Sequence, residues 1–313
     1  MTVKIVTDST SDLSPQVAQE LEITVVPVYV RFGERVYRDG VDISQDEFYQ
    51  KLAQSSVHPS TAAPSPGDFA KVYEEAAQET DEIVSIHLTS KHSATYDSAL
   101  QGRELVGAGC RIEVVDSLSL SMGLGLIAMA AARLANGGEG LQAVMDEVRQ
   151  AIRCVRLLGV LDTLKYLLRG GRIGKSRALL GTLLNVKPLL TMRDGELLPA
   201  GLARTRAKGI ERLFDFVKSA LNVQEVAIVH STAPDEASSL KERIGSIFAK
   251  ERIHMARLGP ALGVHGGPGT LILAVREKVG NIRQDASEGE PLKKRFSLPS
   301  LHIPKLRFSC PQL

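Results

Sequence analysis

Residues 3–13 read Val-Lys-Ile-Val-Thr-Asp-Ser-Thr-Ser-Asp-Leu, an apolar β-branched run that ends in a loop rich in hydroxyl groups. A similar run over residues 83–88 precedes a second such loop at 89–95, and a third loop spans 60–65. Each loop is followed by a helix signal, and hydroxyls together with free N–H groups of a helix N-terminus suit a bound anion. Serine and threonine also cap helices, so one such loop alone would indicate little. Three of them, with the glycine-rich stretch at 262–269, predict one small-acid site assembled from separate segments.

The composition excludes several classes of protein. A chain of 313 residues with 43% hydrophobic content is long enough for two domains with their own cores. A formal net charge of +2 gives no dominant basic field, so we expect no nucleic-acid partner. No stretch approaches the ~20 apolar residues of a membrane span, which predicts no transmembrane segment and leaves transient membrane contact open.

The cysteines and the first residues predict a cellular location. Cys110, Cys154 and Cys310 are odd in number and far apart in the chain, which argues against a disulfide framework and fits a reducing compartment. The chain starts directly with a strand pattern rather than with a basic and then apolar signal peptide. We therefore expect a cytoplasmic protein.

Strand and helix patterns alternate along the chain, as in an α/β protein with largely parallel sheets. The expected strands are 3–7, 23–32, 83–88, 111–116, 157–160, 187–192, 196–199, 226–230, 254–258 and 270–276, and the expected helices start at Pro15, Ser44 and Ser65 or span 122–134, 162–168, 206–221 and 234–248. We predict two α/β domains in series, 1–155 and 156–280, with the ligand site near their junction. Residues 281–313 form a Pro-rich, basic segment, for which composition favours a flexible tail over a docking segment.

Two apparent nucleotide motifs fail on spacing. The stretch 170–176 resembles a phosphate loop, but it has one residue too few between Gly170 and Gly174 and it follows a helix signal. The glycines of 123–128 come six residues after Ser117 rather than directly after the strand, so they indicate helix packing. There is no G-x-S-x-G elbow and no H-E-x-x-H pair, and the seven histidines lack metal-ligand spacing, so we expect no metal.

Several long motifs, in order, resemble those of the DegV family over residues 1 to about 280. They are VKIVTDSTSDL (3–13), STAAPSPGDF (60–69), LTSKHSATYDSA (88–99), VDS (115–117), DTLKYLLRGGRIG (162–174), LNVKPLL (184–190) and the His265 glycine stretch. The resemblance implies a two-domain α/β protein that binds one long-chain fatty acid. It further implies an acyl-carrying subunit, without catalysis of its own or any cofactor besides a palmitate-like ligand. Such a subunit presents the carboxylate to a separate ATP-dependent fatty acid kinase, and the acyl phosphate feeds phospholipid synthesis.

The resemblance assigns Thr61 and Ser93 as the direct donors to the fatty-acid carboxylate, with His265 in the supporting network. Hydroxyl groups suit this role because they donate hydrogen bonds without the cost of burying a fixed charge. Taken singly, Ser93 could equally well be an N-cap and Thr61 a turn residue, whereas a lone His265 would more often be a structural histidine.

Further polar residues are expected around the same pocket. Asp8, Ser9 and Thr10 are assigned as supporting residues, with Asp8 in an orienting role because a carboxylate cannot accept from another unless one is protonated. The resemblance also places Arg172 and Arg204 at the pocket mouth, in contact with the kinase or the acyl phosphate, where a guanidinium matches phosphate geometry.

The sequence departs from the usual family pattern near the expected head group. Ala62 and Ala63 stand where Ser and Gln are common, which removes a potential polar neighbour. His92 stands where an apolar residue is usual, and Ala94 stands where Gly is usual.

Two other functions stay open. One is an independent phosphotransferase that uses His265 or His92. The other is a ligand-sensing protein in which the 281–313 segment engages a partner.

Overall fold

The computed structural model describes residues 2–177 and 186–278. The predicted tail at 281–313 and the first two residues of the 184–190 motif lie outside this range. Contacts group the described residues into one compact unit. Strand β8 starts at Val155, where the domain boundary was placed, and the division into two domains stays a prediction.

The first half of the chain builds a parallel sheet with the order β2-β1-β6-β7. Its strands are β1 (Lys4–Asp8), β2 (Ile23–Val26), β6 (Glu82–His87) and β7 (Arg111–Asp116). The central strands are buried on both faces, which explains why they read as continuous apolar runs. One face packs on α3 (Pro66–Ala76) and α4 (Thr95–Leu105), and the other on α1 (Pro15–Glu20), α5 (Met122–Asn136) and α6 (Leu141–Cys154).

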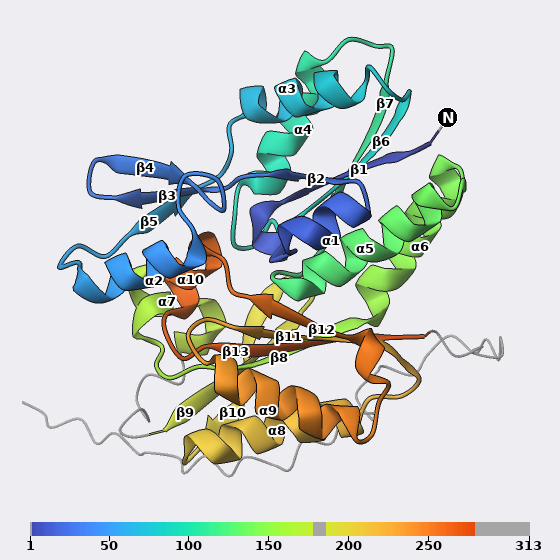
Figure 1. Cartoon of the computed structure of the whole chain (residues 1–313). Coiled ribbons are helices and arrows are strands. Elements are labelled where there is room, and N and C mark those ends of the chain that lie inside the picture. The colour runs from blue at the N-terminus through green and yellow to red at the C-terminus, as the bar shows by residue number, and fades with distance from the viewer. Residues whose placement is uncertain (1, 178–185, 279–313) are drawn as a thin grey trace, which may run out of the picture. The chain divides into compact units, whose positions relative to one another are not determined.

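The second half builds a six-stranded sheet with the order β10-β9-β8-β13-β11-β12. Its strands are β8 (Val155–Val160), β9 (Lys187–Arg193), β10 (Glu196–Ala203), β11 (Val223–His230), β12 (Ile253–Arg257) and β13 (Leu271–Glu277). Helices α8 (Arg206–Lys218) and α9 (Pro234–Gly245) pack on one face, and α5 and α6 pack on the other, between the two sheets (Figure 1).

The α/β class is therefore confirmed, but only the first sheet is parallel throughout. In the second sheet β11–β12 is parallel and the other four pairs are antiparallel. A tight turn at Asp194-Gly195 joins β9 to β10 as a hairpin, with φ of +51° and +77° at these two residues. Strand β13 returns between β8 and β11 in the opposite direction. Pairing between distant strands of this kind leaves no local sequence signal.

The structure adds a small antiparallel sheet, β4-β3-β5, that the sequence did not predict. Its strands are β3 (Tyr29–Phe32), β4 (Arg35–Arg38) and β5 (Ser60–Ala62). The expected single strand 23–32 is divided at Pro27 and Val28, because proline donates no ladder hydrogen bond and the Val28 N–H donates to Ser9 Oγ at 3.0 Å. Helix α2 (Gln45–Gln54) and helix α10 (Pro260–Gly266) pack against this sheet.

Local capping chemistry agrees with the sequence patterns at two helix starts. Ser44 accepts from the Glu47 N–H while Glu47 accepts from the Ser44 N–H, which is a complete capping box for α2. Ser65 and Asp68 form the same arrangement for α3. Among residues 2–177 and 186–278, no helix has the length and hydropathy that crossing a bilayer requires.

Candidate ligand cavity and its polar end

A mostly apolar cavity lies on the face of the second sheet that is turned away from α8 and α9. The space between its walls is about 560 Å³, a value that includes open solvent at its mouth. Strands β8, β9 and β13 form its floor, with contributions from α7 (Lys165–Arg169) and α10. The lining residues are Leu120, Leu157, Gly159, Leu161, Leu167, Leu190, Thr191, Met192, Leu197, Leu258, Leu262, His265, Gly266, Thr270 and Ile272.

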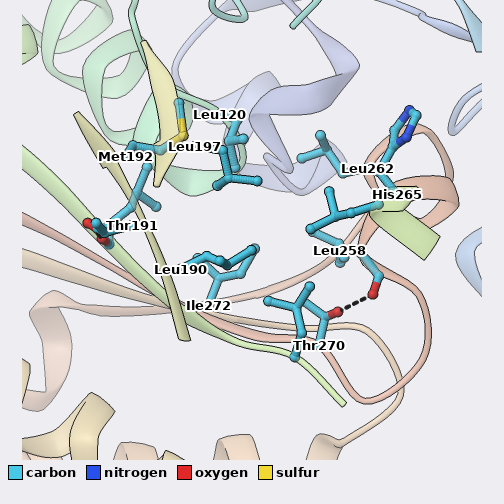
Figure 2. Close-up of a pocket in the computed structure, with 15 residues that line it drawn as sticks. Leu120, Leu190, Thr191, Met192, Leu197, Leu258, Leu262, His265, Thr270 and Ile272 are labelled. Carbon is cyan, nitrogen blue, oxygen red and sulfur yellow. Dashed lines mark hydrogen bonds between the residues drawn. The ribbon is translucent and has the colours of Figure 1, made fainter. Parts of the chain in front are cut away.

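Figure 2 shows His265 and Met192 on opposite sides of this cavity, with leucine and isoleucine side chains between them. Two of the polar side chains in the lining are held by backbone carbonyls. Thr270 Oγ1 donates to Gly266 O at 2.8 Å, and Thr191 Oγ1 donates to Leu157 O at 2.6 Å. The third is His265, whose partner is another side chain.

Thr61 and His265, which the resemblance assigned together, meet in the structure. Thr61 Oγ1 lies 3.1 Å from His265 Nε2, although the two residues are 204 positions apart in the chain. Thr61 lies on β5, opposite Val30 of β3, and His265 lies in the last turn of α10. The expected glycine loop at 262–269 is thus a helix as far as Gly266, because Pro260 takes the first helical position and the Gly263 N–H reaches the Gly259 carbonyl at 2.8 Å.

His265 is held in its neutral form. Burial, reinforced by the positive charge of Arg172, lowers the pKa of His265 to about 3. Its Nδ1 is buried and has no hydrogen-bond partner among the described residues. Gly170 lies directly against this ring edge, since a β-carbon there would be 2.7 Å from His265 Cε1 and closer still to Nδ1.

Ser93 lies next to His92 in the loop before α4, and this loop contacts Arg172 of the 162–174 motif. Ser93 Oγ is 2.8 Å from Thr95 Oγ1, at the start of α4. The adjacent His92 accepts from the Leu197 N–H at 3.1 Å, and its carbonyl accepts from Arg172 Nε at 3.4 Å. Ser93 is not among the cavity-lining residues, and its role as a carboxylate donor stays a prediction.

His92, which stands where the family usually has an apolar residue, takes part in a hydrogen bond to the backbone of β10. Burial lowers the pKa of His92, so the neutral imidazole can accept the hydrogen bond from Leu197 at the start of the cavity strand β10. Arg172 is exposed and also donates to Gly170 O at 2.9 Å, which ties it to the glycine that covers His265. Arg204 is exposed between β10 and α8. The predicted contacts of both arginines with a kinase or an acyl phosphate stay predictions.

Asp8 and Thr10 are buried, Ser9 is half-buried, and none of the three lines the cavity. Asp8 accepts from the Leu88 N–H at 3.0 Å, pairs with His87 Nδ1 at 3.0 Å and accepts from Thr10. Burial opposes ionisation of Asp8, but these bonds hold its pKa below the ordinary value. Its orienting role stays a prediction.

Ser9 connects this network to the helix that carries His265. Ser9 Oγ donates to Asp39 Oδ2 at 3.0 Å, and the same Asp39 oxygen accepts from the Ala261 N–H in α10 at 3.2 Å. Asp12 accepts from the Gly259 N–H, just before α10, at 2.8 Å, and from Ser121 Oγ. Burial raises the pKa of Asp12 to about 8 and that of Asp39 to about 7. These carboxyl groups fix the start of α10.

Sequence patterns missed several residues that shape the site. Gly170 was noted in the failed phosphate loop and in the 162–174 motif but was given no role, although its missing side chain makes room for His265. The apolar lining could not be distinguished from an ordinary core, because its Leu, Ile and Met side chains are also the ones that fill cores. Among the described residues, no group of three or more His, Cys, Asp or Glu side chains is arranged to hold a metal ion.

Fold and cavity together define an α/β protein with a mostly apolar cavity. One lining residue, His265, contacts Thr61, which lies outside the lining. The sequence model of one family, described as "Uncharacterised protein, DegV family", matches residues 2–278. The chain belongs to the DegV family, which confirms the resemblance.

Curated relatives agree with this assignment over nearly their whole length. A DegV domain-containing protein of Caldanaerobacter subterraneus is 34% identical over 279 residues, which cover 88% of this chain and 99% of the relative. A DegV domain-containing protein of Streptomyces coelicolor is 35% identical over 281 residues, with 88% and 99% covered.

Similar solved structures include proteins that bind fatty acids. A Thermus thermophilus DegV family protein, described for its fatty acid binding, is 35% identical, with a TM-score of 0.83 over 89% of this chain and all of its own. DegV of Bacillus subtilis, a fatty acid binding protein, is 28% identical, with a TM-score of 0.80 and the same coverage. A stearic acid-binding protein of Eubacterium ventriosum is 28% identical, with a TM-score of 0.78 over 88% and 98%.

Proposed function

We propose that this protein binds a single long-chain fatty acid in the cavity, with the carboxylate at the Thr61–His265 end. The observation that carries the proposal is the mostly apolar lining with His265 in it, a buried histidine whose Nε2 contacts Thr61. Three similar structures of fatty-acid-binding proteins support it.

The tail supplies the affinity. Burying about 15 methylene groups at about 0.8 kcal/mol each gives a gross gain of roughly 12 kcal/mol. Association and ordering of the chain remove several kcal/mol of this, which leaves an affinity in the nanomolar to micromolar range. The head group then contributes orientation more than strength.

The tautomer of the buried His265 imidazole determines whether the Thr61 hydroxyl can donate a hydrogen bond to a carboxylate. A buried N–H without a partner is rarer and costlier than a buried lone pair, so the unpartnered Nδ1 favours the tautomer with the proton on Nε2. In that tautomer Nε2–H donates to Thr61 Oγ1. The Thr61 hydroxyl proton is then free to donate to the carboxylate, with Ser93 as the second donor.

The protein would act as a carrier and not as an enzyme. We propose that it works in the cytoplasm and presents the carboxylate to an ATP-dependent fatty acid kinase, which Arg172 and Arg204 contact at the cavity mouth. A phosphotransferase that uses His265 is not favoured, because Nε2 is engaged by Thr61 and Nδ1 is covered by Gly170. The sensing alternative rests on residues 281–313, outside the described range.

Native mass spectrometry of the purified chain tests the proposal, followed by extraction and identification of the lipid. We expect one bound long-chain fatty acid, which is lost in a Thr61→Val/Ser93→Ala variant that stays folded. Valine keeps the β-branched shape of threonine, so Thr61→Val replaces only the hydroxyl, by a methyl group. A protein that is empty and takes up no added palmitate would refute the proposal.

The carrier role needs a separate experiment with ATP, palmitate and a bacterial fatty acid kinase. Acyl phosphate should form only when both proteins are present. An Arg172→Ala/Arg204→Ala variant should retain palmitate but support much slower turnover. Acyl phosphate formation by this chain alone would contradict the carrier role.

A further inference from the structure

The floor of the cavity contains a glycine in the middle of a sheet. Gly159 lies in β8, which pairs with β9 on one side and with β13 on the other. Glycine weakens the interior of a strand, because it loses more backbone freedom than other residues and packs no side chain. Its presence there needs a physical reason.

Neither the backbone nor the neighbouring atoms require glycine at this position. Gly159 is not among the residues with positive φ. A β-carbon on it would meet Ile272 Cγ1 at 3.4 Å, Leu271 O at 3.7 Å and Leu161 Cδ1 at 3.9 Å, which are ordinary van der Waals contacts. By contrast, a β-carbon on Gly209 would be 2.6 Å from Val160 Cγ2. The protein alone therefore has room for a β-carbon at position 159.

The strand register shows where that side chain would point. Side chains alternate between the faces of a strand, and Leu157, Gly159 and Leu161 all line the cavity. The direct neighbours of Gly159 across the sheet are Ile272 on β13 and Leu190 on β9, which also line it. The missing side chain is thus a gap in the cavity floor between two bulky apolar residues.

Figure 2 shows Leu190 and Ile272 between His265 and Met192. A chain that starts at His265 and extends toward Met192 crosses this part of the floor. We propose that Gly159 is a specificity-determining residue, whose lack of a side chain lets a long acyl chain pass over β8 into the far part of the cavity. This inference rests on the proposed fatty-acid binding and adds the position that limits the length of the acyl chain.

Side chains of increasing size at position 159 test the proposal. The dissociation constants of decanoate and palmitate are measured for the wild type, Gly159→Ala and Gly159→Val. The Gly159→Val substitution should weaken palmitate binding by about tenfold or more, because overpacking a filled cavity is costly, while decanoate binding changes by less than about threefold. Gly159→Ala should shift the ratio of the two constants in the same direction, by a smaller factor.

Folding is checked by thermal unfolding of the free proteins. Alanine fits the unliganded structure, so Gly159→Ala should keep or raise the wild-type Tm, and it decides the question if Gly159→Val fails to fold. Gly107→Val is the matched control, because a β-carbon on this exposed loop glycine would meet no atom within 4 Å.

Two results separate the inference from the function on which it rests. If the wild type binds neither fatty acid, the proposed function fails. If the wild type binds palmitate, the proposed function stands. If the ratio of the decanoate and palmitate dissociation constants is then the same in the variants as in the wild type, the role of Gly159 is overturned. An equal loss of both ligands in the variants would overturn that role as well.

Discussion

Gly170 lies so close to His265 that a methyl group on Gly170 would overlap the imidazole at Nδ1. The glycine comes from the loop after α7, and the histidine comes from the last turn of α10. The backbone of Gly170 has φ of −77°, which any residue adopts. The contact with His265 is therefore the reason why a side chain is excluded here.

Gly170→Ala should displace the His265 ring and break its hydrogen bond with Thr61, because the new methyl group and the imidazole cannot occupy the same space. We expect palmitate affinity to fall by about tenfold or more, since overpacking typically costs about 1–3 kcal/mol. Isothermal titration with palmitate measures the change. The control is Gly107→Ala, and equal palmitate affinity in wild type and Gly170→Ala would contradict the predicted displacement.

Asp12→Asn should flatten the pH dependence of stability. The unfolded chain loses the Asp12 proton near pH 3.8, whereas the folded protein keeps it up to about pH 8. The free energy of unfolding therefore falls as pH rises through this window. Asn cannot titrate, and it suits the left-handed backbone of Asp12, with φ of 53°.

Urea unfolding at several pH values within this window measures the slope for wild type and Asp12→Asn. Asp39→Asn should remove a second contribution of the same sign, which ends near pH 7. An unchanged slope in both variants would show that neither carboxyl group stays protonated in the folded protein.

Glu225→Gln should change the pH dependence of stability in the acid range, below pH 4.5. Burial alone would raise the pKa of Glu225, but His254, Arg133 and Arg276 around it hold the value at about 2. Its contribution to stability is present above pH 4.5 and is lost as pH falls toward 2. We expect this substitution to lower the free energy of unfolding at neutral pH by roughly 3 kcal/mol and to reduce acid sensitivity. Acid unfolding curves identical to wild type would contradict this assignment.

Gly102→Ala should destabilise the protein although alanine favours helices. Gly102 lies in α4, and a β-carbon there would be 2.6 Å from Phe69 Cβ and 2.8 Å from Pro66 O in α3. Overpacking at this helix contact costs about 1–3 kcal/mol, which exceeds the gain of about 1 kcal/mol in helix propensity. Thermal unfolding compares it with Gly67→Ala, whose β-carbon would meet only Ser65 Oγ, at 3.7 Å. A Tm for Gly102→Ala at or above that of Gly67→Ala would disprove the close-contact argument.

The sequence predicts the elements of this fold better than their pairing. The strand at Arg111–Asp116 and the capping boxes at Ser44 and Ser65 follow from local chemistry, namely β-branched runs and side chains that bond to nearby N–H groups. The mixed second sheet could not be predicted, because the pairing of β13 with both β8 and β11 joins residues far apart in the chain.

The residues of the site likewise fall into those that the sequence could name and those that it could not. The resemblance named Thr61 and His265, and the structure brings them together at 3.1 Å. Local patterns predicted loops around both residues. In the structure Thr61 lies on β5, which pairs with β3, and His265 lies on α10, which packs on the same small sheet. Gly159 and Gly170 could not be assigned, because the meaning of an absent side chain depends on what fills the space beside it.

The burial of helix α5 between the two sheets affects how the chain folds during its synthesis. Met122 to Ala132 are buried along the whole length of that segment, and its core joins strands of both sheets, including residues as late as Ala274. A ribosome that has released only the first half of the chain therefore exposes an apolar surface whose partner strands are not yet synthesised. The nascent protein remains open to aggregation until β13, the last strand among the described residues, has emerged.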